Sequence, residues 1–332
     1  MKKITGLKVA AAAATLALSL SACGGGSSTG ASSAGGDGAK KKIEILQFVT
    51  HAALDSTNKG FVKGLADNGF PADKVEITQQ NAAGDAPNNT QMATKISQGK
   101  PDLVFAIATP SAQAVANAVK STPVLFTAVT DPVGAKLVKS AEAPGANVTG
   151  TSDRNPVKEQ LELLKKLKPD AKTVGIVYSS AEPNSAVQVQ WAKDAAVGLG
   201  LTIEEKAISA SSEVSQAASS LNVDAIYVPT DNAVVSGLAS LVKVAESKKT
   251  LVLGAEAGTV KAGAVATVGI NYEKLGEQTG AMAAKILKGE AKPADMPVET
   301  QSEYDVYVNE KAAKNIGLTI PADVLSSAVE KY

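Results

Sequence analysis

The chain has 332 residues, with 33 Lys and Arg against 33 Asp and Glu, one His and one Cys. This length suggests about two domains, and 44% hydrophobic with 20% charged residues excludes a disordered chain. The balanced charge argues against a nucleic-acid-binding protein, the single Cys excludes a disulfide framework, and the single His disfavours His-based metal sites and catalytic triads.

The first residues have the pattern of a secretory signal. Lys2 and Lys3 precede an apolar run over residues 9–20, which is too short to span a bilayer and matches the apolar part of a signal. The run ends in Leu-Ser-Ala-Cys at residues 20–23, which resembles the lipobox of bacterial lipoproteins. That resemblance implies a signal over residues 1–22, lipidation of Cys23 and anchoring to the outer face of the cell membrane.

Residues 23–41 are predicted to form a tether, because residues 24–38 are almost wholly Gly, Ser and Ala. From residue 42 onward, short apolar runs alternate with amphipathic segments, a pattern typical of βαβ units and parallel sheets. Strands are expected at residues 43–49, 75–79, 103–108 and 124–128, and helices at 54–68, 90–98 and 111–120.

The pattern then restarts, which indicates a second lobe. Strands are expected at residues 173–178, 202–207, 225–228, 251–253 and 265–270, with helices at 185–199, 214–221 and 234–248. The boundary is placed near residues 150–156, before a helix at 157–167. A long helix at 272–288, a strand at 304–308 and a short C-terminal helical segment follow. The fold class is therefore α/β, with two doubly wound parallel-sheet lobes and a ligand cleft at the carboxyl ends of the strands.

Polar residues gather where several of these strands end. Thr109 and Ser111 flank Pro110 at the start of a helix, where their hydroxyls and the free N–H groups could hold a carboxylate. Asp231 follows another strand and could pair with a ligand ammonium or cap the next helix. Asp131 stands in a similar position, but Asp-Pro is also a turn signal. The remaining candidate ligand-binding residues are Gln47, His51, Asn81, Ala112, Asn184, Ser185, Asn232 and Glu256.

Several motifs of nucleotide-binding proteins and hydrolases are missing. The chain has no Gly-Lys-Ser/Thr phosphate loop, no Gly-x-Gly-x-x-Gly after the first strand and no Gly-x-Ser-x-Gly elbow. His51 has no companion ligands for a metal. No cofactor, no metal and no nucleic-acid partner are therefore expected, and the chain is predicted not to be an enzyme.

The chain resembles ABC-transporter substrate-binding lipoproteins, and more narrowly the type I periplasmic-binding family that includes tryptophan- and tyrosine-binding lipoproteins. The resemblance extends over residues 43–320 and is carried by residues 51–55, 81–85, 108–113, 129–134, 147–150, 227–232 and 272–276.

The resemblance implies a cleft that closes on one small solute by a hinge of three crossings, near residues 151–155, 269–272 and 292–297. Lobe 1 would comprise residues 42–153 and 272–292, and lobe 2 residues 154–271 and 293–332. It also implies a monomer that binds an amino acid, often an aromatic one, and delivers it to an ABC permease with its ATPase. Phe48, Phe126 and Tyr178 are the expected ring partners.

Other functions stay open on the sequence alone. The ligand could be a sugar or a nucleoside, although few aromatic residues are present for stacking on a sugar. The protein could be a ligand sensor instead of a transporter component. A surface hydrolase that uses Asp131, Asp231 or Glu256 is the least favoured reading, because nothing in the sequence places two carboxylates at a set separation.

Overall fold

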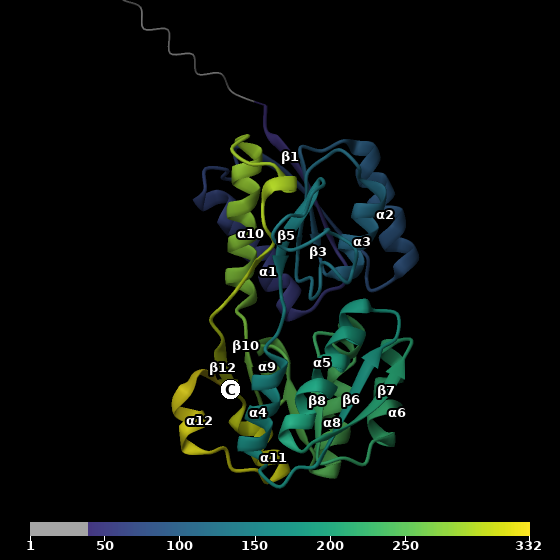
Figure 1. Cartoon of the computed structure of the whole chain (residues 1–332), viewed down its shortest axis with the longest axis vertical. Helices are drawn as coiled ribbons and strands as arrows, with labels where there is room; N and C mark the ends of the chain where they lie inside the picture. The colour runs from purple at the N-terminus through teal and green to yellow at the C-terminus, as the bar shows by residue number, and fades with distance from the viewer. Residues whose placement is uncertain (1–38) are drawn as a thin grey trace, which may run out of the picture. The chain divides into compact units, whose positions relative to one another are not determined.

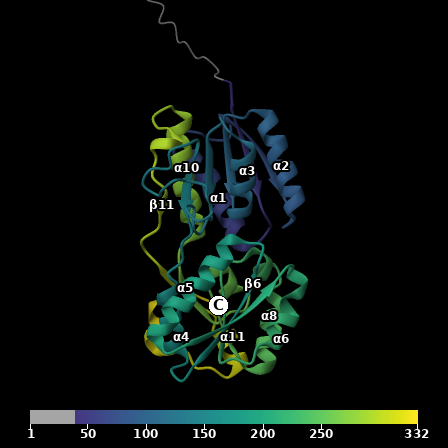
Figure 2. The same ribbon diagram turned by 45° about the vertical axis from the view of Figure 1, so that its right-hand side comes forward.

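Two largely parallel β-sheets, each packed between helices, make up the computed structural model of residues 39–332, the part of the chain that the structure describes (Figure 1, Figure 2). The predicted signal, Cys23 and the tether up to residue 38 lie outside the described residues. The two-lobed α/β fold expected from the sequence is confirmed.

The sheet of lobe 1 is parallel throughout, in the order β11-β5-β4-β3-β1-β2. Its strands are β1 (Lys41–Gln47), β2 (Val75–Asn81), β3 (Leu103–Ile107), β4 (Val124–Thr127), β5 (Val148–Ser152) and β11 (Glu299–Thr300). Helices α1 (Ala52–Asp67) and α10 (Tyr272–Leu287) pack together on one face, and α2 (Ala86–Gly99) and α3 (Thr109–Ala118) on the other (Figure 1). Every residue of β3 is buried, because helices cover the sheet on both faces. The continuous apolar sequence of this strand is typical of such a position.

The sheet of lobe 2 has the order β13-β12-β10-β9-β8-β6-β7, and only the pair β10–β12 is antiparallel. Its strands are β6 (Thr173–Ser179), β7 (Thr202–Ile208), β8 (Ala225–Val228), β9 (Leu251–Gly254), β10 (Ala266–Gly269), β12 (Asp305–Val308) and β13 (Ala328–Lys331). Its helices are α4 (Val157–Leu167), α5 (Pro183–Leu199), α6 (Val214–Ser220), α7 (Asn232–Ser236), α8 (Leu238–Lys248), α9 (Ala257–Lys261), α11 (Glu310–Ile316) and α12 (Ala322–Ser327). Short 3₁₀ helices span Ser211–Glu213 in lobe 2 and Pro293–Asp295 in lobe 1.

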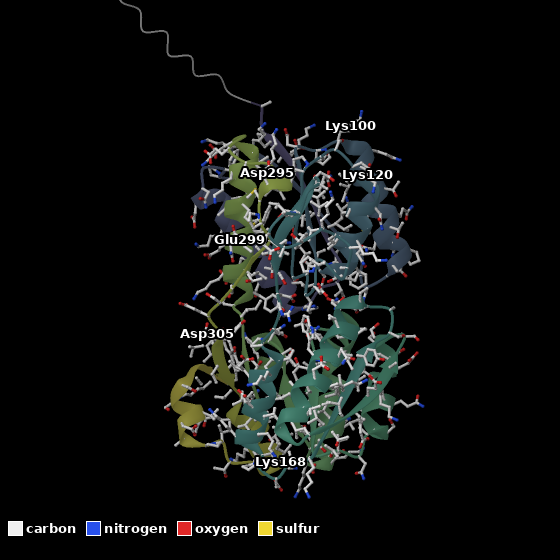
Figure 3. The ribbon with its side chains drawn as sticks, in the orientation of Figure 1. Lys100, Lys120, Lys168, Asp295, Glu299 and Asp305 are labelled. Atoms are coloured by element: carbon white, nitrogen blue, oxygen red, sulfur yellow. The ribbon has the colours of Figure 1, made fainter. Side chains whose placement is uncertain are left out.

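The chain passes between the lobes three times, at residues 153–156, 270–271 and 301–304. The third crossing is later than the expected 292–297, and the expected lobe boundary at residue 293 is wrong for the same reason. Glu299 pairs with Thr151, so β11 extends the sheet of lobe 1, and the Thr149 hydroxyl donates to the Met296 carbonyl at 2.7 Å. Figure 3 shows Glu299 beside lobe 1 and Asp305 beside lobe 2, with the crossing between them.

Helices α1 and α10 touch at their backbones. A Cβ atom on Gly276 of α10 would lie 2.0 Å from the Thr57 carbonyl oxygen, and one on Gly60 of α1 would lie 2.0 Å from the Glu273 carbonyl oxygen. Gly64 and Gly280 show similar approaches. Only glycine permits this spacing, which joins the returning helix α10 to lobe 1.

A cation–π contact anchors the lobe 2 end of the first crossing. The guanidinium carbon of Arg154 lies 4.1 Å from the ring centroid of Trp191 on α5. These are the only Arg and the only Trp in the whole sequence.

Replacing Gly276 by Ala should lower the free energy of unfolding by about 1–3 kcal/mol, because the new methyl group forces the two helices apart. The matched control is Gly198→Ala on the exposed end of α5, where a Cβ atom meets nothing within 4 Å, so Ala should be neutral or slightly stabilising. Urea unfolding of both variants measures the difference. Equal stabilities would mean that the backbone contact is easily relaxed.

Candidate functional site

An enclosed cavity lies between the lobes, where strands of both sheets end. Its volume is about 20 Å³, close to the space that one water molecule needs. His51, Ala108 and Asp153 line it from lobe 1 and the first crossing, and Asn184, Asn232 and Glu256 line it from lobe 2. This is the position at which open α/β sheets bind their ligands.

His51 contacts lobe 2 directly across this cavity. Its Nε2 atom lies 3.2 Å from Oδ1 of Asn232. Because the Asn232 amide nitrogen donates to the carboxylate of Glu182, Oδ1 must accept from His51. Nδ1 of His51 is buried without a partner in the described residues. In a neutral imidazole this second nitrogen is therefore a free acceptor.

Glu182 is buried at the start of α5 and was not among the residues singled out from the sequence. Its carboxylate accepts N–H groups from the Asn232 backbone and side chain, from the Ala233 backbone and from the Asn184 side chain. Burial, with the charge of Asp231 as a second cause, raises the pKa of Glu182 to about 7, and the N–H donors oppose that rise. A carboxylate thus lies next to the one direct hydrogen bond described between His51 and lobe 2.

Asp231, the expected partner of a ligand ammonium, is fully buried and occupied by backbone donors. Its Oδ1 caps α7 by accepting from the Val234 N–H at 2.9 Å, and its Oδ2 accepts from the Ser179 N–H at 2.5 Å. Burial raises the pKa of Asp231. The structure therefore places this residue as a cap that joins α7 to the end of β6, and it lines neither the enclosed cavity nor the groove beside it.

Thr109 begins α3 and is 1% exposed, yet its hydroxyl has no hydrogen-bond partner among the described residues. The preceding Ala108 lines the cavity and has φ of +81°, which an L residue adopts only under strain. Ser111 differs, because its hydroxyl donates to Oδ1 of Asn89 on α2 at 2.9 Å. Ala112 is fully buried in the core of lobe 1. Of Thr109, Ser111 and Ala112, only Thr109 has a side-chain hydroxyl without a hydrogen-bond partner in the described residues.

The other candidates on lobe 2 also differ in whether their polar atoms have partners within the protein. Glu256 lines the cavity, but its carboxylate caps α9 by accepting from the N–H groups of Gly258 and Thr259. Asn184 also lines the cavity, and its Oδ1 is buried without a partner in residues 39–332. Ser185 is fully buried beneath it.

Three lobe 1 candidates lie away from the enclosed cavity. Gln47 joins β1 to α1 by donating to the Asp55 carboxylate at 2.7 Å. Asn81 is exposed, and its Oδ1 accepts from the Ala83 N–H at 2.8 Å. Asp131 accepts from the Gly134 N–H at 2.9 Å, which is the turn that the Asp-Pro sequence allowed.

Two buried residues of the first crossing were missed by sequence reasoning. Asp153 accepts hydrogen bonds from the Tyr272 hydroxyl at 2.7 Å and from the Thr130 hydroxyl at 2.9 Å, and burial raises its pKa. Asn155 is 4% exposed, and neither of its amide atoms has a partner in the described part of the chain. Asp153 and Asn155 could have been found from the sequence, because they are two polar residues in a segment predicted to connect the lobes.

An open groove of about 540 Å³ lies beside the enclosed cavity, and Asn232 lines both. Its apolar walls include Phe48 and Pro110 from lobe 1 and Ala181 and Ala210 from lobe 2. The other two expected ring partners lie elsewhere: Phe126 is fully buried in lobe 1, and Tyr178 packs against the core of lobe 2.

Neither a metal cluster nor a membrane span is found in the residues that the structure describes. Over residues 39–332, no three side chains of the His, Cys, Asp or Glu type gather in an arrangement that could hold an ion. Over the same residues, no helix combines the length and the apolar character needed to cross a bilayer.

Comparisons with known proteins agree with this architecture. The model of the family described as ABC transporter substrate binding protein matches residues 42–332. A tyrosine-binding protein of Clostridioides difficile is 45% identical over 282 residues, which are 84% of this chain and 81% of that protein.

Two solved structures differ in how well they align. An ABC domain from Streptococcus pneumoniae in complex with L-Trp has 42% identity and a TM-score of 0.86, over 89% of this chain and all of the other. A ligand-free, open substrate binding protein from Clostridium difficile has 49% identity but a TM-score of only 0.68, over 87% of this chain and 98% of the other. The chain as a whole therefore aligns better with the Trp-bound structure than with the ligand-free, open one.

The buried Glu182 predicts a pH effect on stability. Its pKa is higher in the folded chain than in the unfolded chain, so folding binds a proton and the free energy of unfolding falls as pH rises through this range. Between roughly pH 5 and pH 8, the wild type should lose about 1–3 kcal/mol more than Glu182→Gln. Urea unfolding across this range measures both slopes. Identical slopes would show that Glu182 stays ionised throughout.

Proposed function

Because the chain belongs to the family of ABC transporter substrate-binding proteins, we propose that its cleft binds an aromatic α-amino acid. Proteins of this family act outside the cytoplasm as solute receptors, and the relatives found here are not enzymes. The observation that carries the proposal is a set of buried, unpartnered polar atoms: those of His51 and Asn184, which line the enclosed cavity, and that of Thr109, which lies next to the lining residue Ala108. The names of the relatives supply the ligand class, since one is called tyrosine-binding and another is solved with L-Trp.

The free groups suit the two charges of an α-amino acid. The carboxylate would bind at the N-terminus of α3, where the Thr109 hydroxyl adds a donor to the first-turn N–H groups. The ammonium would bind on lobe 2, where Asn184 Oδ1 is an unpaired acceptor and Glu182 supplies negative charge. Glu182 lines the groove and takes over the role expected for Asp231, which lines neither the groove nor the enclosed cavity.

The ligand side chain would occupy the open groove, against Phe48. The groove has about 540 Å³, whereas the enclosed cavity has about 20 Å³, and small-molecule pockets usually need about 300–1,000 Å³. Because the enclosed cavity has room for about one water molecule, the charged groups of an amino acid can enter it only if the lobes move apart at the three crossings. A bound ligand that bridges both lobes then stabilises the closed arrangement.

Membrane anchoring and delivery complete the proposal. We place Cys23 as a lipidated N-terminus that holds the monomeric receptor at the outer face of the membrane. The mass of the mature N-terminal peptide tests whether Cys23 carries the lipid. The receptor passes its ligand to an ABC permease. The alternatives are a sensing role and a sugar or nucleoside ligand. The following measurement distinguishes an amino-acid ligand from a sugar or a nucleoside.

L-Trp, L-Tyr or L-Phe should raise the melting temperature of the full-length chain, because each binds the folded state alone. At a concentration about 100 times the dissociation constant, the stabilisation is about 2.7 kcal/mol. The measurement is thermal unfolding against twenty amino acids, common sugars and nucleosides. A shift with a sugar or nucleoside, and none with any amino acid, contradicts the proposed ligand class.

Thr109→Val should weaken amino-acid binding about tenfold or more, because it removes a hydroxyl that would bond to a charged group. The folded state should lose little, since this hydroxyl has no partner within the protein. Ser111→Ala is the matched control: it removes the hydrogen bond to Asn89 and should cost stability while leaving affinity nearly unchanged. Calorimetric titration with the ligand found above measures both, and equal affinities would remove Thr109 from the site.

A further inference from the structure

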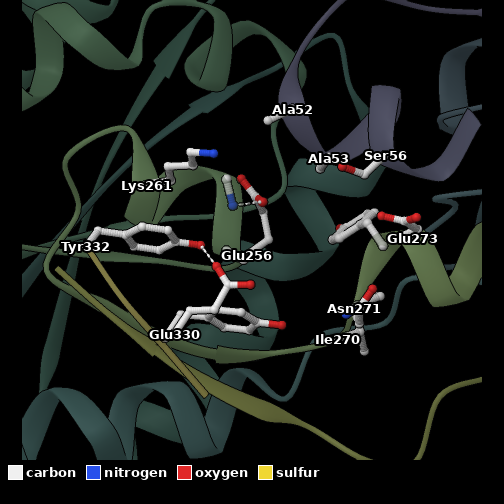
Figure 4. Close-up of a pocket in the computed structure, with 14 residues that line it drawn as sticks. Ala52, Ala53, Ser56, Glu256, Lys261, Ile270, Asn271, Glu273, Glu330 and Tyr332 are labelled. Atoms are coloured by element: carbon white, nitrogen blue, oxygen red, sulfur yellow. Dashed lines mark hydrogen bonds between the residues drawn. The ribbon is translucent and has the colours of Figure 1, made fainter. Parts of the chain in front are cut away.

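A separate cavity of about 330 Å³ lies between the lobes at the second crossing (Figure 4). Lobe 1 contributes Ser56 on α1, and lobe 2 contributes Lys261 on α9 and Glu330 on β13. Ala53, Glu256 and Tyr272 line both this flank cavity and the small enclosed cavity of the cleft. Its size lies within the usual range of small-molecule sites.

One positive and one negative group of this flank cavity are free of ion pairs. Lys261 has no carboxylate within 4 Å in the described chain, and Glu330 accepts only from the Tyr332 hydroxyl, at 2.6 Å. The other two carboxylates are already compensated: Glu256 caps α9, and Glu273 pairs with Lys59 at 2.9 Å. The charges left for an occupant are therefore one of each sign, which suits a zwitterion.

Aromatic groups complete the lining. Three of the six tyrosines, Tyr272, Tyr307 and Tyr332, reach this cavity from α10, β12 and the end of the chain. Tyr307 is only 4% exposed and lines the cavity from β12. Burial, then the charges of Asp305 and Glu330, raises the pKa of Tyr307 to about 12. This phenol is therefore neutral, and its aromatic ring forms part of the cavity wall.

We propose that the flank cavity is a second binding site, for a zwitterionic amino acid. The ammonium lies at Glu330, the carboxylate lies at Lys261, and an aromatic side chain packs against the tyrosine rings. Because the walls come from both lobes, an occupant favours the closed arrangement, and by linkage it binds more tightly when the cleft is filled. The site goes beyond the proposed function and shares with it only the ligand class.

Equilibrium dialysis with L-tyrosine on the full-length chain tests this site. The wild type should bind two equivalents, and the double variant Lys261→Met/Glu330→Gln should bind one, because its second dissociation constant rises tenfold or more. Both side chains are exposed, so the variant should fold normally. The control Lys206→Met/Glu204→Gln changes the same residue types at exposed positions of β7, which lines neither cavity, and should still bind two.

The outcomes separate the two proposals. Two equivalents in the Lys261/Glu330 double variant would overturn the flank site. One equivalent in the wild type, weakened by Thr109→Val and unaffected by the double variant, would also overturn it while leaving the cleft proposal intact. No binding of L-tyrosine at all would overturn the flank site and count against L-tyrosine as the cleft ligand.

Discussion

The backbone contact between α1 and α10 is the constraint on which the cleft depends. Four glycines let the two helices approach until a single methyl group would collide with a carbonyl oxygen. The N-terminus of α1 carries His51 to the cavity, and the N-terminus of α10 carries Tyr272 to the first crossing. The exposed ion pairs along the same helices, such as Lys59 with Glu273, add little by comparison. The position of one wall of the binding cleft is thus set by the absence of side chains, not by their interactions.

The cleft itself is built from residues that finish secondary structure elements. Asp231 and Glu256 cap short helices of lobe 2, and their carboxylates are consumed in doing so. The groups that stay free are those for which the local fold offers no partner, as at Thr109, where a strained turn precedes the helix. Polar residues at strand ends therefore have two distinct roles, one inside the protein and one toward a ligand. The second role falls to the atoms that the fold leaves unpaired.

This division explains how far the sequence could predict the structure. The short apolar runs indicate both sheets, because a strand that is buried on both faces is apolar along its whole length, as β3 is. Strand ends likewise indicate the mouth of the cleft. Whether a candidate side chain is free to bind a ligand depends on hydrogen-bond partners that are distant in the sequence. Asp231 accepts from Ser179, 52 residues away, and Ser111 donates to Asn89. The third crossing was misplaced because β11 has only two residues and is defined by its pairing with β5. Pairing across the chain leaves no local pattern.

The stacked pair at the first crossing has a practical consequence. Trp191 is the sole indole of the chain, and the only guanidinium lies 4.1 Å from its ring, in a segment that must bend when the lobes separate. Indole emission is sensitive to a nearby charge, so the protein carries its own optical probe of hinge geometry. Excitation at wavelengths that tyrosine does not absorb would follow the movement of the lobes without any attached dye, with phenylalanine or tyrosine present as solute.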